Sequence, residues 1–435
     1  MKGFKILIFS LILFGWTNAN LLAANNKIFN ANELFETNMD KSRKAVSTLA
    51  YQPLGLNLDE SKATEIFLGS HKNFTIQNFP ITETVNSNVE FETIRPVIDA
   101  NTLWMRGTEE GIVPAEGPAM VSFKGKIKGE ENSHVYLNYT EGQLFGFIQH
   151  DNGAQYTITP SLTDKNSKKD NFYLLSSSEN EFVNEDLTKF ICGTEPPDDV
   201  IEHDNKGMSA DEIKSTKLLQ ADIAVEAEYR YYQRLDNDYD KAAAYIANVM
   251  ALTSRIYEEN INVTLYIPYV LIWESSGNDP YYNRQYLHQK LYRMPSAWQQ
   301  RGVDKTLAVL FADLQSQPGN TKVAGISMGG NPKRGSLCSD NRGYCVFGIH
   351  GTYEYPTLRY TWDVSVASHE MGHNFSAAHT HHCYYNPPID TCVTQDYNGV
   401  GDACIEHGPP TPRPGTIMSY CHTTNSTHSV QLFFH

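Results

Sequence analysis

The chain has 435 residues and a formal net charge of −15 at pH 7, and 40% of its residues are hydrophobic. A chain of this length is expected to form two domains. The acidic balance argues against nucleic acid as a partner and favours a soluble extracellular protein.

The first residues, MKGFKILIFSLILFGWTNA, have the layout of a secretory signal peptide. Two lysines precede an apolar run from Ile6 to Trp16, and small residues follow it. We therefore expect residues 1–24 to be a signal peptide, cleaved after Ala19 or Ala24. The run is too short to span a bilayer, and no other stretch approaches about 18 apolar residues, so we expect a secreted protein without a stable membrane anchor.

The region from residue 25 to about 193 has the pattern of β structure. The segments VEFETIRPVI, MVSFKGKI, HVYLNY and YTITP alternate apolar and polar residues, and Gly, Asn and Asp turns separate them. This region is therefore predicted to be mostly β.

A change of composition follows at residues 194–216, TEPPDDVIEHDNKGMSADEIKST. The segment is acidic, contains proline and has almost no large apolar residues, which predicts an exposed linker that proteases can cut. We place the domain boundary here, with a β-rich domain over 25–208 and a second domain over 209–435.

The seven cysteines divide at this boundary. Cys192 stands alone in FICGTEPPDD, directly before the linker. An exported protein is expected to pair the six cysteines of the second half, and we favour short-range pairs such as Cys338 with Cys345. These six are Cys338, Cys345, Cys383, Cys392, Cys404 and Cys421.

Beyond the linker the pattern becomes α/β. Strands are predicted at the start of LQADIAVEAEYRYYQRL, in NVTLYIPYVLIW and in KTLAVLFAD, and a helix is predicted in YYNRQYLHQKLYRMPSAWQQ. Another long amphipathic helix is indicated by an apolar stripe at Tyr245, Val249, Leu252 and Ile256. This alternation predicts a mixed sheet with helices packed against it.

Residues 368–382, SHEMGHNFSAAHTHH, have the spacing of a metal site. On a helix, His369 and His373 point from the same face, and Glu370 is rotated by about 100°, beside an ion rather than bound to it. That is the place of a general base for a bound water. His379 requires a turn of the chain to supply a third ligand, which would make an open, catalytic type of zinc site. The helix itself is indicated by an apolar stripe at Val364, Ala367, Met371 and Phe375.

A second element lies downstream, in GTIMSYCH at residues 415–422. It puts Met418 in a tight turn preceded by glycine, and HExxH, a third histidine and such a methionine turn form one pattern. His381 and His382 lie just beyond the three histidines, and we expect them to be exposed loop residues.

With these motifs the sequence resembles the metzincin zinc endopeptidases of the adamalysin (reprolysin) group, and it is most similar to the secreted bacterial members. The resemblance is strongest from about Leu218 to Cys421. It implies a zincin-like catalytic domain with Zn²⁺ as cofactor and a protein or peptide as substrate. It also implies residue roles: Glu370 as the base, Met418 as the floor under the metal, and, as zinc ligands, His369, His373 and His379.

Two further positions, Ser376 and Tyr420, lie near the motif. The family pattern has glycine where this chain has Ser376, and a left-handed backbone there would cost about 1–2 kcal/mol. Tyr420 lies two residues after Met418, where the related astacins and serralysins have a tyrosine that reaches the zinc or the reacting carbonyl oxygen. We hypothesise that Tyr420 helps to hold the oxyanion; the alternative is a tyrosine of the core.

The surroundings of Cys192 are similar to the cysteine switch in the propeptides of adamalysins and matrix metalloproteinases. By that resemblance the thiolate occupies the open zinc position, and the region over 25–208 is a prodomain that acts as an intramolecular inhibitor. The alternative is a leftover free thiol or an intermolecular disulfide. By the same resemblance, the stretch VAGISMGG at residues 323–330 is expected to be the edge strand that binds an extended peptide, although its glycines are equally compatible with a bulge.

The sequence therefore predicts a secreted zinc endopeptidase made as a zymogen. One alternative is a thermolysin-like peptidase with Glu406 as third ligand, but its context ACIEHGPP has no helical pattern. Another is a zinc-binding module without activity, or one inactivated by truncation, since the chain stops at His435 soon after Met418.

Overall fold

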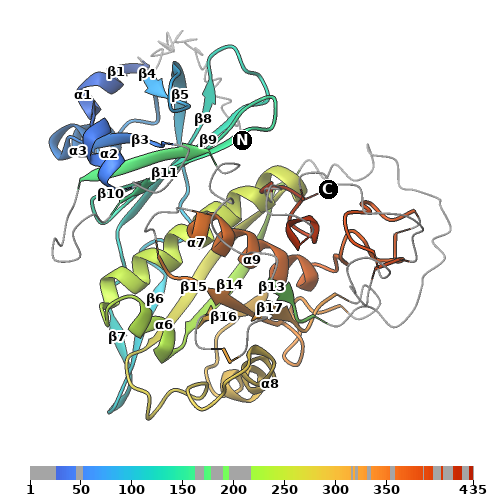
Figure 1. Cartoon of the computed structure of the whole chain (residues 1–435). Coiled ribbons are helices and arrows are strands. Elements are labelled where there is room, and N and C mark those ends of the chain that lie inside the picture. Colours follow the sequence, from blue (N-terminus) through green and yellow to red (C-terminus); the bar gives the residue numbers. More distant parts are fainter. Residues whose placement is uncertain are drawn as a thin grey trace, which may run out of the picture.

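A computed structural model of the chain forms two β sheets with their helices (Figure 1). The structure describes residues 26–45, 52–161, 171–177, 190–194, 217–314, 317–318, 322–330, 335–352, 358–385, 387–394, 403–404, 415–423 and 431–434. The predicted signal peptide and nearly all of the predicted linker lie outside these residues. Within them, no helix is long and apolar enough to cross a membrane.

The first sheet is built from the N-terminal part of the chain, and its core is rich in phenylalanine. A sharp hairpin joins two of its central strands through Glu141 and Gly142, which both have positive φ, as the tight turns that suit twisted strands require. The short helices α1 (Ala31–Leu34), α2 (Met39–Ala45) and α3 (Glu60–Phe67) accompany the sheet. In spatial order its described strands are β1 (Lys27–Asn30), β4 (Asn73–Pro80), β5 (Asn86–Ile94), β8 (Met120–Ile127), β9 (His134–Thr140), β10 (Gln143–Gln149), β11 (Gln155–Pro160), β12 (Phe172–Ser177), β3 (Leu54–Leu58) and β2 (Phe35–Thr37).

The second sheet is mixed. Strand β17 is antiparallel to β18, whereas β18, β16, β14 and β15 follow one another in parallel. In spatial order the described strands are β13 (Phe190–Cys192), β17 (Lys322–Ser327), β18 (Tyr344–Ile349), β16 (Leu307–Asp313), β14 (Leu219–Ala227), β15 (Val263–Trp273), β6 (Leu103–Thr108) and β7 (Gly111–Ala115). The mixed sheet and the mostly β N-terminal region that the sequence predicted are both present.

Helices cover both faces of the second sheet. The long helices α7 (Tyr239–Ile261) and α9 (Leu358–Asn374) lie side by side and share one core with it, and α8 (Leu287–Trp298) packs on the opposite face (Figure 1). The short helices α6 (Tyr229–Arg234) and η4 (Cys421–Thr423) complete this part. The predicted apolar stripe of α7 is buried in the shared core, as are Val364, Ala367 and Met371 of α9, which confirms both helices. Phe375 follows the end of α9 and is only partly buried.

The start and the middle of α9 are each fixed by buried hydrogen bonds. Near its start, the Asp363 carboxylate accepts the N–H groups of His350 and Gly351 at 2.9 and 3.0 Å. Further along, the Tyr257 hydroxyl of α7 donates to Ser368 O at 2.9 Å. These bonds hold α9 against α7 and β18, so its last two turns have a defined position beside the sheet.

The two sheets do not follow the boundary predicted at residue 208. Strands β6, β7 and β13 come from the N-terminal region, yet all three lie in the second sheet. The predicted division into domains therefore stays a prediction, since strands from both regions lie in the second sheet.

The predicted disulfide between Cys338 and Cys345 is wrong. Cys345 points into the core from β18, whereas Cys338 is exposed, and both thiols are free. The described disulfides are instead Cys383–Cys404 and Cys392–Cys421.

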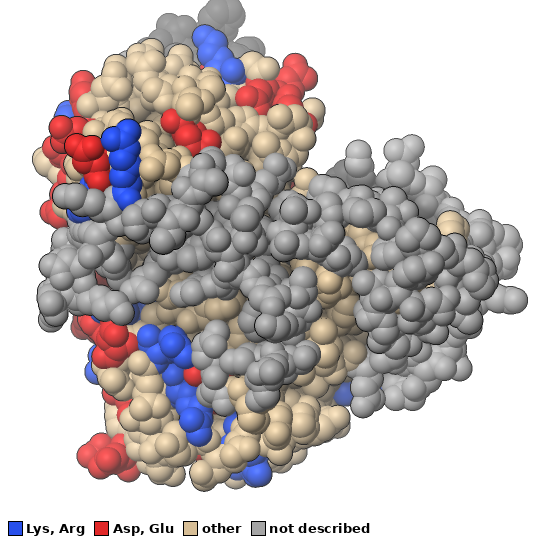
Figure 2. Space-filling model, in the orientation of Figure 1, with Lys and Arg blue, Asp and Glu red and all other residues tan. Residues whose placement is uncertain are grey.

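On the face shown in Figure 2, acidic (red) and basic (blue) side chains lie interspersed among the residues that the structure describes.

Candidate metal centre

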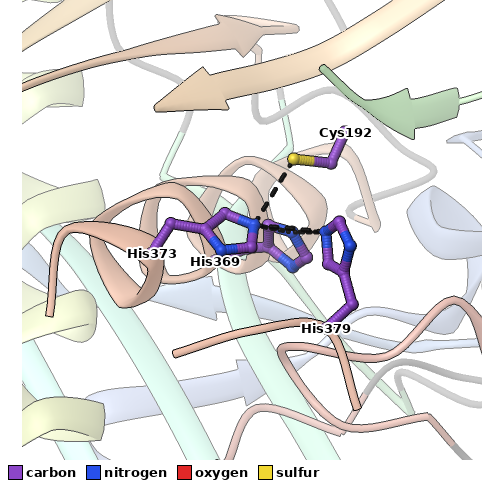
Figure 3. A group of neighbouring side chains, drawn as sticks. All are labelled: Cys192, His369, His373 and His379. Carbon is purple, nitrogen blue, oxygen red and sulfur yellow. Dashed lines mark hydrogen bonds between the residues drawn. The ribbon is translucent and has the colours of Figure 1, made fainter. Parts of the chain in front are cut away.

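Three histidines converge at the C-terminal end of α9 (Figure 3). The Nε2 atoms of His369 and His373 are 3.1 Å apart, and each lies 3.2 Å from His379 Nε2. Cys192 Sγ completes a group whose four ligand atoms all lie within 4.8 Å of one another. Imidazole nitrogens this close to one another fit a single ion bound at about 2 Å from each, so the group could hold a metal.

The Nδ1 atoms of His369 and His373 make hydrogen bonds that leave each Nε2 atom able to bind a metal. His369 Nδ1 lies 2.6 Å from Ile417 O, and His373 Nδ1 lies 2.8 Å from Ala377 O. Because a carbonyl oxygen only accepts, each Nδ1 carries the proton and each Nε2 keeps its lone pair for a metal. Burial, with a further contribution from His379, lowers the pKa of His369 to about 3, so its ring is neutral, as a metal ligand must be.

A sharp turn after α9 brings the third histidine into place. Ser376 has φ +75°, so the condition under which a residue other than glycine is strained at this position is met. Its N–H donates to His373 O, and the Ala377 N–H donates to Gly372 O, each at 2.9 Å. These bonds hold a turn that reverses the direction of the chain, and the turn brings His379 next to His369 and His373.

Glu370 is only 1% exposed and lies beside the histidines. Burial raises its pKa to about 8, and hydrogen bonds from Cys192 and Thr194 oppose that rise. Strand β17 passes so close that a Cβ at Gly325 would lie 2.4 Å from Glu370 Oε1, and one at Gly329 would lie 2.2 Å from a backbone oxygen of α9. Glycine at these two positions therefore lets β17 and the loop after it approach α9.

The segment of residues 190–194 lies directly over this site. Cys192 Sγ lies 3.5 Å from His373 Nε2 and 3.6 Å from Glu370 Oε2. Thr194 donates its hydroxyl hydrogen to Glu370 Oε2 at 3.1 Å and accepts the Ser327 N–H at 2.8 Å. Thr194 was not predicted as a site residue, because its only signal in the sequence is its place two residues after Cys192.

Two further predicted residues lie next to the histidines. Tyr420 Oη accepts the Cys192 N–H at 3.0 Å, and its ring centroid is 4.7 Å from that of His379. Met418 is in a turn, buried to 3% exposure, and its sulfur would lie 2.8 Å from a Cβ at Gly372 of α9. The structure thus places both side chains at the site, and their roles stay predictions.

The expectation that His381 and His382 are exposed is wrong. They are 1% and 9% exposed. The His381 ring stacks on His379 at a centroid distance of 5.2 Å, and His382 pairs with Ala403 in a short antiparallel bridge. The disulfide Cys383–Cys404 adjoins this bridge and holds the two segments over the histidines.

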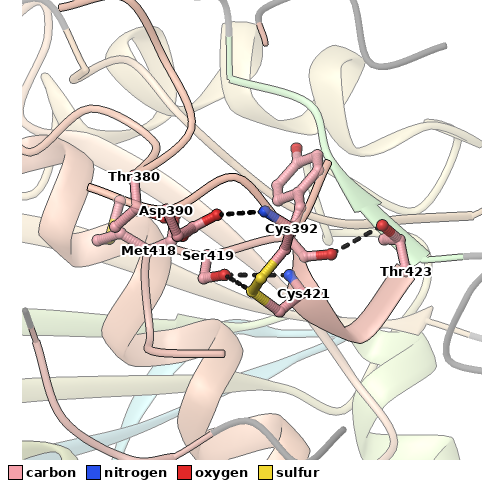
Figure 4. Close-up of a disulfide and its surroundings, with 8 residues drawn as sticks. Thr380, Asp390, Cys392, Met418, Ser419, Cys421 and Thr423 are labelled. Carbon is pink, nitrogen blue, oxygen red and sulfur yellow. Dashed lines mark hydrogen bonds between the residues drawn. A yellow bond between two sulfur atoms is a disulfide. The ribbon is translucent and has the colours of Figure 1, made fainter. Parts of the chain in front are cut away.

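The second disulfide closes the same side of the site (Figure 4). It joins Cys392 to Cys421, the residue after Tyr420. The Ser419 hydroxyl oxygen accepts the Cys421 N–H at 3.0 Å, and Asp390 accepts the Cys392 N–H at 3.2 Å. The loop that carries Tyr420 is therefore cross-linked to the segment after His379.

A mostly apolar cavity opens beside Glu370 and His369. It lies between α9, the turn around Met418 and the segment that carries Cys192. Its side chains include those of Ile191, Trp362, Val366, Ile417 and His422.

Residues 217–429 match the family model described as metallo-peptidase family M12, of reprolysin type. No protein with a curated description matches the sequence. The α/β part of the chain is therefore a metallopeptidase domain of family M12, a zinc-dependent family. More particularly, it belongs to the reprolysin-like metzincins.

Proposed function

We propose that the chain is the zymogen of a secreted, zinc-dependent endopeptidase. The observation that carries this proposal is the convergence of three imidazole Nε2 atoms, 3.1–3.2 Å apart, beside the buried carboxylate of Glu370. His379 is the third ligand in this proposal, whereas the alternative candidate Glu406 lies outside the described residues. The two disulfides support export, since such bonds persist in oxidising compartments.

The chemistry divides between the metal and the side chains around it. The three histidines would hold the zinc ion, and the bound ion would supply Lewis-acid chemistry, which lowers the pKa of water toward about 7 and polarises a carbonyl group. Glu370 takes the proton of the attacking water and delivers it to the amine nitrogen that leaves. Tyr420 donates its hydroxyl hydrogen to the oxyanion of the tetrahedral intermediate. Met418 packs beneath α9 and supports the ligands.

In the latent chain, the segment around Cys192 blocks these roles. Its thiol stands at the fourth position of the ligand group, and its backbone engages the Tyr420 hydroxyl. Removal of this segment frees Tyr420, Glu370 and the edge of β17 together. An extended peptide can then pair with that edge, and the apolar cavity beside Glu370 favours substrates with an apolar side chain next to the cleaved bond.

The test is cleavage of a quenched-fluorescent peptide library by the zinc-loaded full chain after it has been cut within residues 178–189 and within residues 195–216, so that the Cys192 segment can leave. We expect the activity to disappear in the Glu370→Gln variant, which should still bind zinc, and in the presence of a chelator. The matched control is Asp236→Asn, which changes a carboxylate that is 76% exposed and should leave the activity unchanged. Activity in the Glu370→Gln variant would refute the role of Glu370 as the general base. Folded, zinc-loaded protein that does not cleave peptide would favour a binding module without activity.

A further inference from the structure

The N-terminal region covers both edges of the second sheet. At the edge beside the metal centre, β13 pairs with β17, and at the opposite edge β6 pairs with β15. The β6 pairing runs over five residue pairs, from Leu103 opposite Tyr269 to Gly107 opposite Trp273. One contact therefore blocks the site, and the other lies across the full width of the sheet from it.

The strand pairing at β15 continues into the loops at both of its ends. The N–H groups of Glu274 and Ser275 both donate to Gly107 O, at 2.9 and 3.1 Å. At the other end, the Ile267 N–H donates to Val97 O at 2.8 Å. The backbone of the N-terminal region thus continues the sheet beyond β6 itself.

Side chains add specificity to this contact. Gly107 lies so close to Trp273 that a Cβ there would be 2.0 Å from the indole ring. The Asn278 side-chain amide donates to Thr108 O and Glu109 O at 2.7 and 2.9 Å. The tip of the hairpin formed by β6 and β7 is therefore held by the loop after β15.

A separate contact joins the first sheet to α7. The Tyr136 hydroxyl of β9 donates to Glu259 Oε1 at 2.7 Å. The Thr140 hydroxyl donates to Asn248 Oδ1 at 3.1 Å, and both of these side chains are buried. These bonds depend neither on the linker nor on the metal centre.

We propose that the edge of β15 is a binding surface for the β6–β7 hairpin, and that the N-terminal fragment stays bound as a separate chain after the linker is cut. A cut between residues 195 and 216 removes one covalent connection but leaves both sheet edges paired. The hairpin then keeps the Cys192 segment at a high effective concentration next to its site. A single cut in the linker therefore leaves the site blocked, and a second cut between β12 and β13 separates the blocking segment from the hairpin.

The experiment places a recognition sequence for a specific protease within residues 195–216 of the full chain. After cleavage, size-exclusion chromatography at micromolar concentration should show both fragments in one peak. Co-elution should persist with a chelator and in the Cys192→Ala variant, because the hairpin and not the thiol holds the fragment. Separate peaks in any of these three samples would overturn the proposal.

Variants then locate the contact that holds the fragment. Gly107→Val should raise the dissociation constant of the two fragments at least about tenfold after cleavage, because the added side chain collides with Trp273 while the contacts of β9 with α7 remain. The matched control is Gly335→Val, at a glycine whose added Cβ would meet no atom within 4 Å, and this variant should co-elute. Asn278→Ala removes only the two bonds to the hairpin tip and should raise the dissociation constant about tenfold, so it serves if Gly107→Val does not fold. An unchanged dissociation constant in either variant would contradict the role of β15.

Activity provides a second readout, which rests on the proposed peptidase function. The chain cut once should remain inactive, and a chain cut also within residues 178–189 should cleave peptide although its N-terminal body still co-elutes. Full activity after the single cut, with the fragments still together, would refute the proposal that the hairpin keeps the Cys192 segment over the metal centre. Because co-elution needs no catalysis, a failure of the peptidase proposal is distinguishable from a failure of this one.

Discussion

At the scale of single residues, Thr194 is a second contact between the blocking segment and the metal centre. Its hydroxyl bridges the Glu370 carboxylate and the Ser327 N–H. The substitution Thr194→Val keeps the shape and removes both bonds. Burial raises the pKa of Glu370 to about 8, so this group is mostly uncharged at neutral pH. Because each hydrogen bond between uncharged groups contributes about 0.5–1.5 kcal/mol, the loss of both bonds should give at least about a fivefold rise in the residual peptidase activity of the uncut chain and in the rate of Cys192 labelling.

The matched control for this substitution is Thr159→Val. The Thr159 hydroxyl is buried and has no hydrogen-bond partner within the described part of the chain. Its loss should change neither activity nor labelling. Equal labelling rates of Cys192 in the Thr194→Val variant and the original chain would show that the hydroxyl does not contribute to latency.

Ser376 stores backbone strain in the turn between the second and third histidines. Its φ of +75° costs a residue with a Cβ about 1–2 kcal/mol, and glycine avoids that cost. We expect Ser376→Gly to raise the Tm of the chain, although the greater freedom of glycine in the unfolded state offsets part of the gain. The control Ser376→Ala retains the Cβ and should not raise it. A lower Tm for the glycine variant would mean that the serine side chain outweighs the strain.

At the scale of elements, the disulfide Cys392–Cys421 holds the Tyr420 loop over the histidines. Replacement of both cysteines by serine should lower the stability of the chain by about 2–4 kcal/mol. Because His369 and His373 lie on α9 outside the cross-linked loops, zinc content should fall less than activity. The measurements are the Tm, bound zinc by elemental analysis and peptide cleavage.

The exposed free thiol of Cys338 offers the control for this disulfide. Cys338→Ser should match the original chain in all three measurements. If the double serine variant kept its full Tm and activity, the disulfide would have no part in positioning the loop.

The sequence predicted those elements whose signals are local. His369 and His373 lie together because a helix repeats every 3.6 residues, and the apolar stripe showed that the helix is there. Strands of the first sheet were predictable for the same reason, because each alternates over its own length. The strain at Ser376 was raised as a possibility only by the resemblance, because the family pattern has glycine at this position.

Elements that depend on distant partners were missed or predicted wrongly. The hairpin of β6 and β7 finds its partner β15 more than a hundred residues further along the chain. His381 and His382 are buried because a disulfide brings another segment over them, and a sequence does not show which cysteines pair. Thr194 gains its contacts only when β13 pairs with β17.

At the scale of the whole molecule, the N-terminal region contributes strands to the second sheet and side chains to its core. One core contains Trp104, Tyr136 and Phe147 from that region together with side chains of α7 and α9. The interface is therefore built like the interior of one domain, with polar groups at its margin. We expect acid to weaken the contact between the N-terminal region and α7 through these polar groups.

Glu259 of α7 lies at this margin, where it contacts Tyr136 of β9. Its pKa is lowered to about 2, mainly by the hydrogen bond with His134 and also by that with Tyr136, against the opposing effect of burial. A carboxylate whose folded pKa is depressed contributes its stabilisation fully above the unfolded value of about 4.5 and loses it as the pH falls toward 2. The Tm of the original chain should therefore exceed that of Glu259→Gln near neutral pH, and the difference should vanish between about pH 4.5 and 2. Glu116→Gln, at an exposed position, should show no such difference at any pH. A gap between Glu259→Gln and the original chain that stays constant down to pH 2 would contradict the pairing and leave the packing around Tyr136 as its cause.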